Sequence, residues 1–100
     1  MEMKLRKEIF NKLLDGSKKS TSRFGERNVH TGDKLVFEMT ENPETKYETV
    51  VSDVFCTTFS EITEEEAILE GYDSLASLKN ALVKIYNPKD SDIFTIIRFV

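Results

Sequence analysis

The sequence has very little cysteine and histidine, and it has no long hydrophobic run. Its one cysteine, Cys56, excludes an intrachain disulfide. The one cysteine and the one histidine together exclude the usual structural zinc sites, which take their ligands from several Cys and His side chains. No apolar stretch approaches the ~18 residues that a membrane-spanning helix requires. We therefore expect a protein without a disulfide, a metal site or a membrane span.

Signals for export and for several domains are also missing. The first ten residues, MEMKLRKEIF, carry charges throughout, whereas a signal peptide needs an apolar segment there. We therefore expect a cytoplasmic protein. No internal repeat, linker or low-complexity segment interrupts the chain, and 100 residues suffice for one modest hydrophobic core. We expect residues 1–100 to form a single domain.

The net charge of −4 conceals an asymmetry along the chain. Residues 1–27 carry eight basic and four acidic side chains, whereas residues 28–100 carry six basic and fourteen acidic ones. An acidic protein lacks the broad positive field that non-specific binding to long nucleic acids needs. A local anion site in the basic N-terminal segment remains open, beside the simpler interpretation of a solvated helix face and loop.

The N-terminal third is predicted to form a helix and then a polar loop. Apolar side chains recur at four-residue spacing, as on one face of a helix, at Leu5, Ile9 and Leu13. We therefore predict a helix over residues 3–15. Gly16 suits the left-handed position that often follows a helix. Residues 17–28 are rich in Lys, Ser, Thr and Arg and offer little apolar material for a core.

The rest of the chain alternates between strand and helix patterns. Strands are predicted at residues 35–39, 47–59 and 93–100, and helices at residues 63–70 and 74–86. The capping pattern that starts at Thr63 and the Asn87–Pro88 pair set two of these limits. The last strand is apolar on both faces, which predicts an interior position. This order favours an α+β domain, a small mixed β-barrel with flanking helices.

The densest polar segment is Gly16-Ser-Lys-Lys-Ser-Thr-Ser-Arg23. It has one glycine where a phosphate-binding P-loop needs two, and it follows a helix rather than a strand. Two functional interpretations stay open. The segment forms a pocket for an anion or a base, or it pairs a hydroxyl nucleophile such as Thr21 with an amine base such as Lys18.

Few residues elsewhere stand out as candidates for chemistry. Glu70 is predicted at the C-terminal end of a helix, where the helix dipole disfavours a carboxylate, so another role could retain it there. Tyr72 and Tyr86 flank the predicted helices and could line a cleft. Cys56 lies in an apolar part of a predicted strand, which favours a small core residue over a reactive thiol.

The whole pattern resembles an ASCH domain of the PUA-like superfamily. The family has a G-x-K-x-x-T-x-R-like segment after its first helix, and Gly16, Lys18, Thr21 and Arg23 fit that segment. Further matching segments follow in order: Thr31–Leu35, Phe59–Glu65, Gly71–Leu75 and Tyr86. The resemblance spans nearly the full chain. It implies a small β-barrel of PUA-like type with helices beside it and a cleft between them.

Among ASCH proteins of this length, the chain is similar to small bacterial N(4)-acetylcytidine amidohydrolases. Those enzymes use a lysine as proton acceptor, a threonine as nucleophile and a glutamate as proton donor. The resemblance places these roles on Lys18, Thr21 and Glu70, and it implies no cofactor and no metal. Lys19, Ser20 and Ser22 depart from the residues that the amidohydrolases carry, which leaves the substrate open.

Two other hypotheses stay beside the enzymatic one. ASCH domains are often linked with RNA, so the cleft could bind a nucleotide or RNA without amidohydrolase activity. Basic side chains would then contact phosphate and an aromatic ring would stack on a base, with Lys19, Arg23, Arg27 and Tyr72 as candidates. A ribonuclease would use the same basic loop. A domain that only binds a protein partner is the third hypothesis, and the oligomeric state is open in all three.

Overall fold

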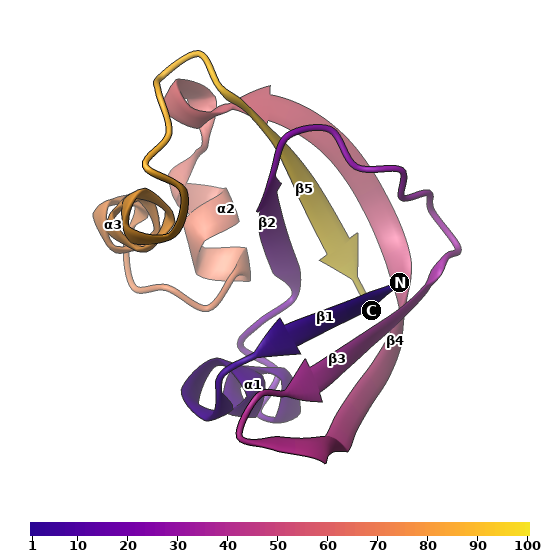
Figure 1. Ribbon diagram of the computed structural model, residues 1–100. Helices are drawn as coiled ribbons and strands as arrows, with labels where there is room; N and C mark the ends of the chain where they lie inside the picture. Colours follow the sequence, from indigo (N-terminus) through magenta and orange to yellow (C-terminus); the bar gives the residue numbers. More distant parts are fainter.

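Five strands form one strongly curved mixed sheet in the order β1-β3-β4-β5-β2 (Figure 1). The computed structural model describes residues 1–100. The strands are β1 (Glu2–Leu5), β2 (Ser20–Phe24), β3 (Lys34–Met39), β4 (Asn42–Thr58) and β5 (Ile93–Phe99). β1 pairs with β3 in parallel, and the other neighbouring pairs are antiparallel. The sheet is thus a half-open barrel with β1 and β2 as its two edges.

Three α-helices pack beside this sheet. They are α1 (Lys7–Leu14), α2 (Glu64–Leu69) and α3 (Leu75–Tyr86), and a short 3-10 turn, η1 (Phe59–Glu61), precedes α2. α2 and α3 lie together on the side of β2 and β5, whereas α1 lies against the ends of β1 and β3 (Figure 1). None of these helices is long and apolar enough to cross a membrane. The α+β class and the barrel-like mixed sheet with flanking helices are confirmed.

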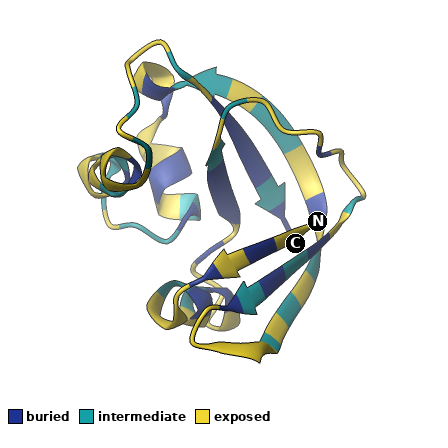
Figure 2. Ribbon diagram, viewed as in Figure 1, coloured by how far each residue is buried: buried dark blue, intermediate teal, exposed yellow.

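Two hydrophobic clusters lie on opposite sides of β5. Ile97 and Phe99 belong to the cluster under α1, and Phe94 and Ile96 belong to the cluster under α2 and α3. All four side chains are buried, so both faces of β5 are covered by other parts of the chain (Figure 2). This confirms the interior position predicted from the sequence, because a strand buried on both faces reads as a continuous apolar run.

The helix predicted over residues 3–15 is wrong in its first turn, because residues 2–5 form β1. Met3 and Leu5 are buried while Glu2 and Lys4 are exposed, which is the two-residue period of a strand. α1 starts only at Lys7, whose backbone N–H donates to both carboxylate oxygens of Glu41, at 3.0 and 3.2 Å. Pairing with β3 therefore overrides the four-residue spacing that starts at Leu5.

The polar segment after α1 is a second departure, because it enters the core instead of forming a loop. Residues 20–24 form β2 and pair with β5 in antiparallel register. Ser20, Thr21 and Ser22 are all buried, at most 2% exposed. The hydroxyls of Thr21 and Ser22 have hydrogen-bond partners there, whereas that of Ser20 has none. Apolar content alone is therefore a poor guide to burial here.

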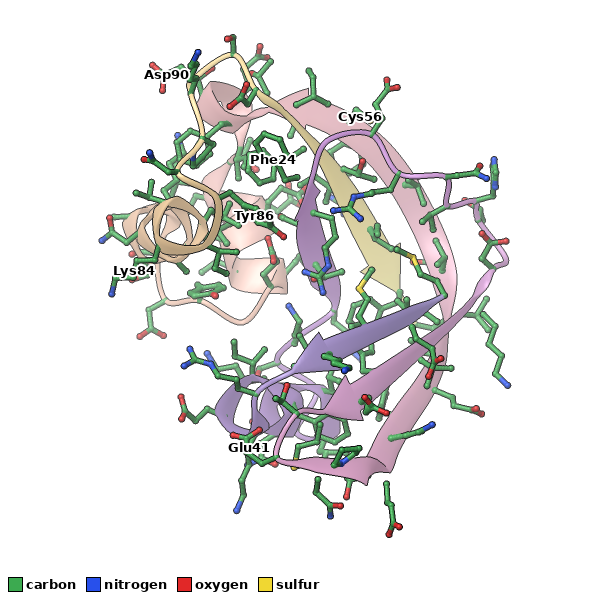
Figure 3. The ribbon with its side chains drawn as sticks, in the orientation of Figure 1. Phe24, Glu41, Cys56, Lys84, Tyr86 and Asp90 are labelled. Atoms are coloured by element: carbon green, nitrogen blue, oxygen red, sulfur yellow. The ribbon has the colours of Figure 1, made fainter.

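Cys56 is also not where the sequence predicts it, since its side chain is exposed rather than in the core. It lies on the long curved strand β4 (Figure 3), with its sulfur 3.8 Å from Thr95 Oγ1 of β5. The neighbouring Phe55 packs against the cluster under α2 and α3. Because successive side chains of a strand point to opposite faces, Cys56 faces away from that cluster.

Candidate active site

Lys18 and Glu70 meet as a buried pair at the side of β2. Lys18 precedes β2, and Glu70 is the last residue of the turn that ends α2. Their side chains are 3% and 5% exposed, and Lys18 Nζ lies 3.8 Å from Glu70 Oε1. Lys18 Nζ also donates a hydrogen bond of 2.8 Å to Ser20 O. Two opposite charges are thus withdrawn from water together, which leaves each dependent on the other.

Burial changes the proton affinity of both groups in this pair. It lowers the pKa of Lys18 to about 8, against the opposing effect of the Glu70 carboxylate. The positive charges of Arg23 and Lys12 lower that pKa further. Burial also raises the pKa of Glu70, although Lys18 and the hydrogen bonds from Ser22 oppose this rise. Desolvation therefore acts against the charged form of each partner, while their mutual attraction acts in its favour.

Ser22 holds the Glu70 carboxyl group in place. The Ser22 N–H donates to Glu70 Oε1 at 3.1 Å, and the Ser22 hydroxyl donates to Glu70 Oε2. Both donors come from one residue of β2, so they fix the plane of the carboxyl group as well as its position. In the sequence Ser22 stands out only as a departure from the amidohydrolases, whereas in the structure it positions the glutamate.

Thr21 lies next to a guanidinium group. Arg23 Nη1 donates to Thr21 Oγ1 at 2.9 Å and to Ser22 O at 3.0 Å. Thr21 and Arg23 share a face of β2 because they are two residues apart in a strand. A fixed positive charge at this distance stabilises negative charge on the threonine oxygen.

These side chains also cover the free edge of β2. The N–H of Phe99 donates to Lys19 O, and the N–H of Gly25 donates to Ile93 O, so Thr21 and Arg23 between them direct their main-chain groups to β5. The even-numbered residues face the open edge. There, Ser20 O accepts from Lys18, Ser22 N–H donates to Glu70, and Ser22 O accepts from Arg23. The charged groups thus satisfy main-chain atoms that a neighbouring strand would otherwise pair.

A cavity of about 780 Å³ opens beside this cluster, a volume typical of small-molecule sites. Its walls are β1, the first half of β2, the loop after α2 and one face of α3. Six of the seven predicted site residues line it, namely Lys18, Thr21, Arg23, Arg27, Glu70 and Tyr72. Lys19 is exposed and does not line it. The wall formed by α3 includes Tyr86, whose ring centre lies 5.5 Å from that of Phe24 (Figure 3).

Comparisons with known proteins were made by sequence and by structure. No family model matches the sequence, and no curated protein matches it. An ASCH domain from Lactobacillus crispatus superposes with a TM-score of 0.79 at 17% identity, covering 89% of this chain and 67% of that one. An ASCH protein from Zymomonas mobilis gives a TM-score of 0.77 at 7% identity, covering 99% and 65%. This chain has the ASCH fold.

A third structure with this fold matches over nearly its whole length. The hypothetical protein PH0355 superposes with a TM-score of 0.71 at 22% identity, covering 99% of this chain and 97% of that one. The chain spans about two thirds of the two ASCH structures named above. At these identities the likeness establishes the fold, and the chemistry of the site depends on this chain's own residues.

Within the ASCH fold, Lys12 ties α1 to the loop that carries Glu70. Lys12 Nζ donates to Gly71 O at 2.7 Å and lies 5.3 Å from the centre of the Tyr72 ring. Gly71 has a positive φ of 91°, and a Cβ there would lie 3.0 Å from Lys12 Cδ. The close approach needs a glycine, and it holds the end of α2 against Lys18.

The contribution of β1 to the site is not evident from the sequence pattern. All of β1 lines the cavity, as do Met1 and Arg6. Residues 3–6 fall in the predicted helix, whose pattern gives no reason to place them opposite β2. The alternation of charged and apolar residues from Glu2 to Leu5 is the signal that could have revealed a strand here.

A second cavity, of about 500 Å³, continues from the first between α1 and α3. The two share Arg6, Glu70, Tyr72 and Lys84 among their lining residues. Lys12 lines only the second cavity. Together they form one groove that runs from the open edge of β2 to the outer side of the helices.

Proposed function

We propose that this protein is an amidohydrolase that removes the acyl group from N(4)-acylated cytidine or a related modified nucleoside. The observation that carries the proposal is the grouping of Lys18, Thr21 and Glu70 around one cavity, with burial favouring a neutral amine and a protonated carboxyl. Acyl transfer to a hydroxyl needs a base, a nucleophile and an acid, and this group supplies one of each.

The proposed reaction proceeds in two halves. Neutral Lys18 accepts the proton of Thr21, whose oxygen attacks the acyl carbonyl, while Arg23 stabilises the negative charge that develops. Glu70 donates its proton to the exocyclic nitrogen as the C–N bond breaks, which releases cytidine and leaves an acyl ester on Thr21. Water then attacks the ester, returning a proton to Glu70, and Lys18 returns its proton to the threonine oxygen. The products are cytidine and the free carboxylic acid.

The direct test is turnover of N(4)-acetylcytidine, followed as cytidine by chromatography. We expect Thr21→Ala to lower kcat by ~10³-fold or more, because it removes the nucleophilic oxygen. Thr21→Ser keeps a hydroxyl and should retain measurable turnover. Thr31→Ala changes an exposed threonine in a turn and serves as the matched control. Turnover by folded Thr21→Ala at the wild-type rate would contradict the proposal.

Binding of RNA or a nucleotide is the second candidate, and the charge of the cavity favours it. The wall holds six basic residues, Lys4, Arg6, Lys18, Arg23, Arg27 and Lys84, but only two acidic ones, Glu2 and Glu70. This excess stands out in a protein whose net charge is −4. A positive groove attracts phosphate, and its continuation between α1 and α3 provides room for more than one nucleotide.

The salt dependence of binding to a single-stranded RNA oligonucleotide tests this candidate. If Arg6 and Arg27 each contact a phosphate, Arg6→Ala and Arg27→Ala should each lower the slope of log K against log salt by about 1. Lys89→Ala removes an exposed lysine that lines neither cavity and should leave the slope unchanged. If Arg6→Ala and Arg27→Ala gave the same salt dependence as Lys89→Ala, the groove would be excluded as the path of the RNA.

A further inference from the structure

The cavity lies between the two edges of the half-open sheet. β1 forms one edge and β2 the other, and residues of both strands line the space between them. A sheet edge exposes main-chain N–H and C=O groups that no neighbouring strand pairs. The two edges of this sheet differ, however, because the groups at the edge of β2 are already bound by Lys18, Glu70 and Arg23.

The edge of β1 has no such cover. Met1 O accepts from the N–H of Val36 at 2.8 Å, and Leu5 O accepts from the N–H of Thr40 at 2.9 Å. In a parallel pair alternate residues face the partner strand, so Met1, Met3 and Leu5 direct their main-chain groups to β3. The main-chain groups of Glu2 and Lys4 consequently point to the free edge.

Packing keeps this edge in place. Met3 and Leu5 are buried in the cluster under α1, and the register of β1 on β3 is continuous from Glu2 to Leu5. Glu2 and Lys4 both line the cavity, opposite the strand that carries Thr21. The free N–H and C=O groups thus form a rigid strip, with alternating donors and acceptors in the plane of the sheet.

The β2 side of the gap is occupied by side chains, so a ligand in it would pair with main-chain groups of β1 alone. A flat molecule that hydrogen-bonds along one side only suits this arrangement. The Watson–Crick edge of a pyrimidine is such a group, because its ring nitrogen and exocyclic oxygen or amine lie in one plane. With N3 and the N4–H of cytosine held at β1, an acyl group on N4 is turned toward C5, away from that edge.

We propose that the free edge of β1 binds the base of a pyrimidine nucleoside through the main-chain N–H and C=O groups of Glu2 and Lys4. This inference rests on the proposed function and adds the recognition of the base to it.

A proline substitution tests the role of the main chain. Lys4→Pro removes the N–H of Lys4, and proline is tolerated on an edge strand where that N–H faces away from the sheet. Lys4→Ala keeps the N–H while removing the side chain. With cytidine as the probe in calorimetry, we expect Lys4→Pro to weaken binding by about 2- to 10-fold relative to Lys4→Ala, the effect of one lost hydrogen bond.

A second measurement does not depend on the folding of a variant. In ¹⁵N-labelled wild-type protein, cytidine should shift the amide protons of Glu2 and Lys4 downfield and slow their exchange, more than those of Met3 and Leu5. Absence of these shifts in protein saturated with cytidine, or equal affinity of Lys4→Pro and Lys4→Ala, would overturn the inference.

The failure of this inference can be distinguished from failure of the proposed function. Turnover of N(4)-acetylcytidine with no effect at β1 would overturn only the recognition by the main chain. Binding of cytidine with shifts at β1 but no turnover would support the recognition and contradict the amidohydrolase. A wild-type protein that neither binds cytidine at millimolar concentration nor turns over N(4)-acetylcytidine would overturn both.

Discussion

Replacement of Lys18 by methionine should lower turnover of N(4)-acetylcytidine by ~10³-fold or more. Methionine fills a similar volume but cannot accept the proton of Thr21, and Lys18 is the amine that lies 3.8 Å from Glu70. Lys89→Met is the matched control, because Lys89 is exposed and lines neither cavity. Circular dichroism of both variants separates loss of the base from loss of the fold. Full activity in Lys18→Met would exclude Lys18 as the base.

The pH profile of the wild-type enzyme belongs to the same prediction. The reactive form has a neutral Lys18 and a protonated Glu70. The pair then holds one dissociable proton, which is on Glu70. Above the Lys18 pKa of about 8 the pair loses that proton, and the rate should fall. At low pH both groups are protonated and the rate should fall again. Burial raises the pKa of Glu70, which places the acid limb above the ordinary range of glutamate.

We therefore expect a bell-shaped profile of kcat/KM with its alkaline limb near pH 8. Each limb is a property of the coupled pair rather than of one residue. A rate that instead rises through pH 8 and then stays constant would mean that Lys18 acts as base without Glu70 as proton donor. Glu70→Gln distinguishes the two cases, because it removes the proton donor but keeps a similar shape.

Substitution of Phe94 by alanine should produce the largest loss of stability, about 3–5 kcal/mol of the free energy of unfolding. Phe94 is completely buried on β5. Its ring centre lies 5.4 Å from that of Phe24, 5.8 Å from Tyr86 and 5.9 Å from Phe59. The substitution leaves a cavity that three separate segments cannot fill together. The total free energy of unfolding of a small domain is about 5–15 kcal/mol, so this loss is a large fraction of it.

Urea unfolding measures this effect, through the midpoint at an unchanged slope. Ile93→Ala is the control, since Ile93 is the neighbour of Phe94 on β5 but is 38% exposed. We expect it to cost well under half as much. If Phe94→Ala cost less than about 1 kcal/mol, the packing of the helices against β5 would not be the main support of this half of the domain.

The local elements could be predicted from the sequence because their signals act over a few residues. The Thr63 hydroxyl accepts from the N–H of Glu66 at 3.3 Å, as the capping pattern implies. The Ser74 hydroxyl accepts from the N–H of Ser77 at 3.1 Å. Asn87 ends α3 in the left-handed conformation, directly before a proline. Each signal is complete within one turn of chain, so tertiary contacts are not needed to read it.

The candidate site residues were proposed from the sequence, Lys18, Thr21 and Glu70 through the resemblance to the ASCH amidohydrolases and the others as contacts for phosphate or a base. Six of the seven line one cavity. Lys19 does not, because it is adjacent to Lys18 and its side chain is exposed. Successive residues of an extended chain point in opposite directions, so a motif defined only by proximity in sequence includes residues of both faces.

Tertiary structure alone decided the features that give these residues their chemistry. The sequence specifies the residue types, the caps and the interior strand β5, whose apolar side chains face both clusters. It does not specify that residues 2–5 pair with β3, since that depends on a strand more than 30 residues away. Nor does it specify that Lys18 and Glu70, 52 residues apart, are buried together. A lysine has a pKa of about 8 only when the folded chain removes water from it, and removal of water is a property of the assembled site.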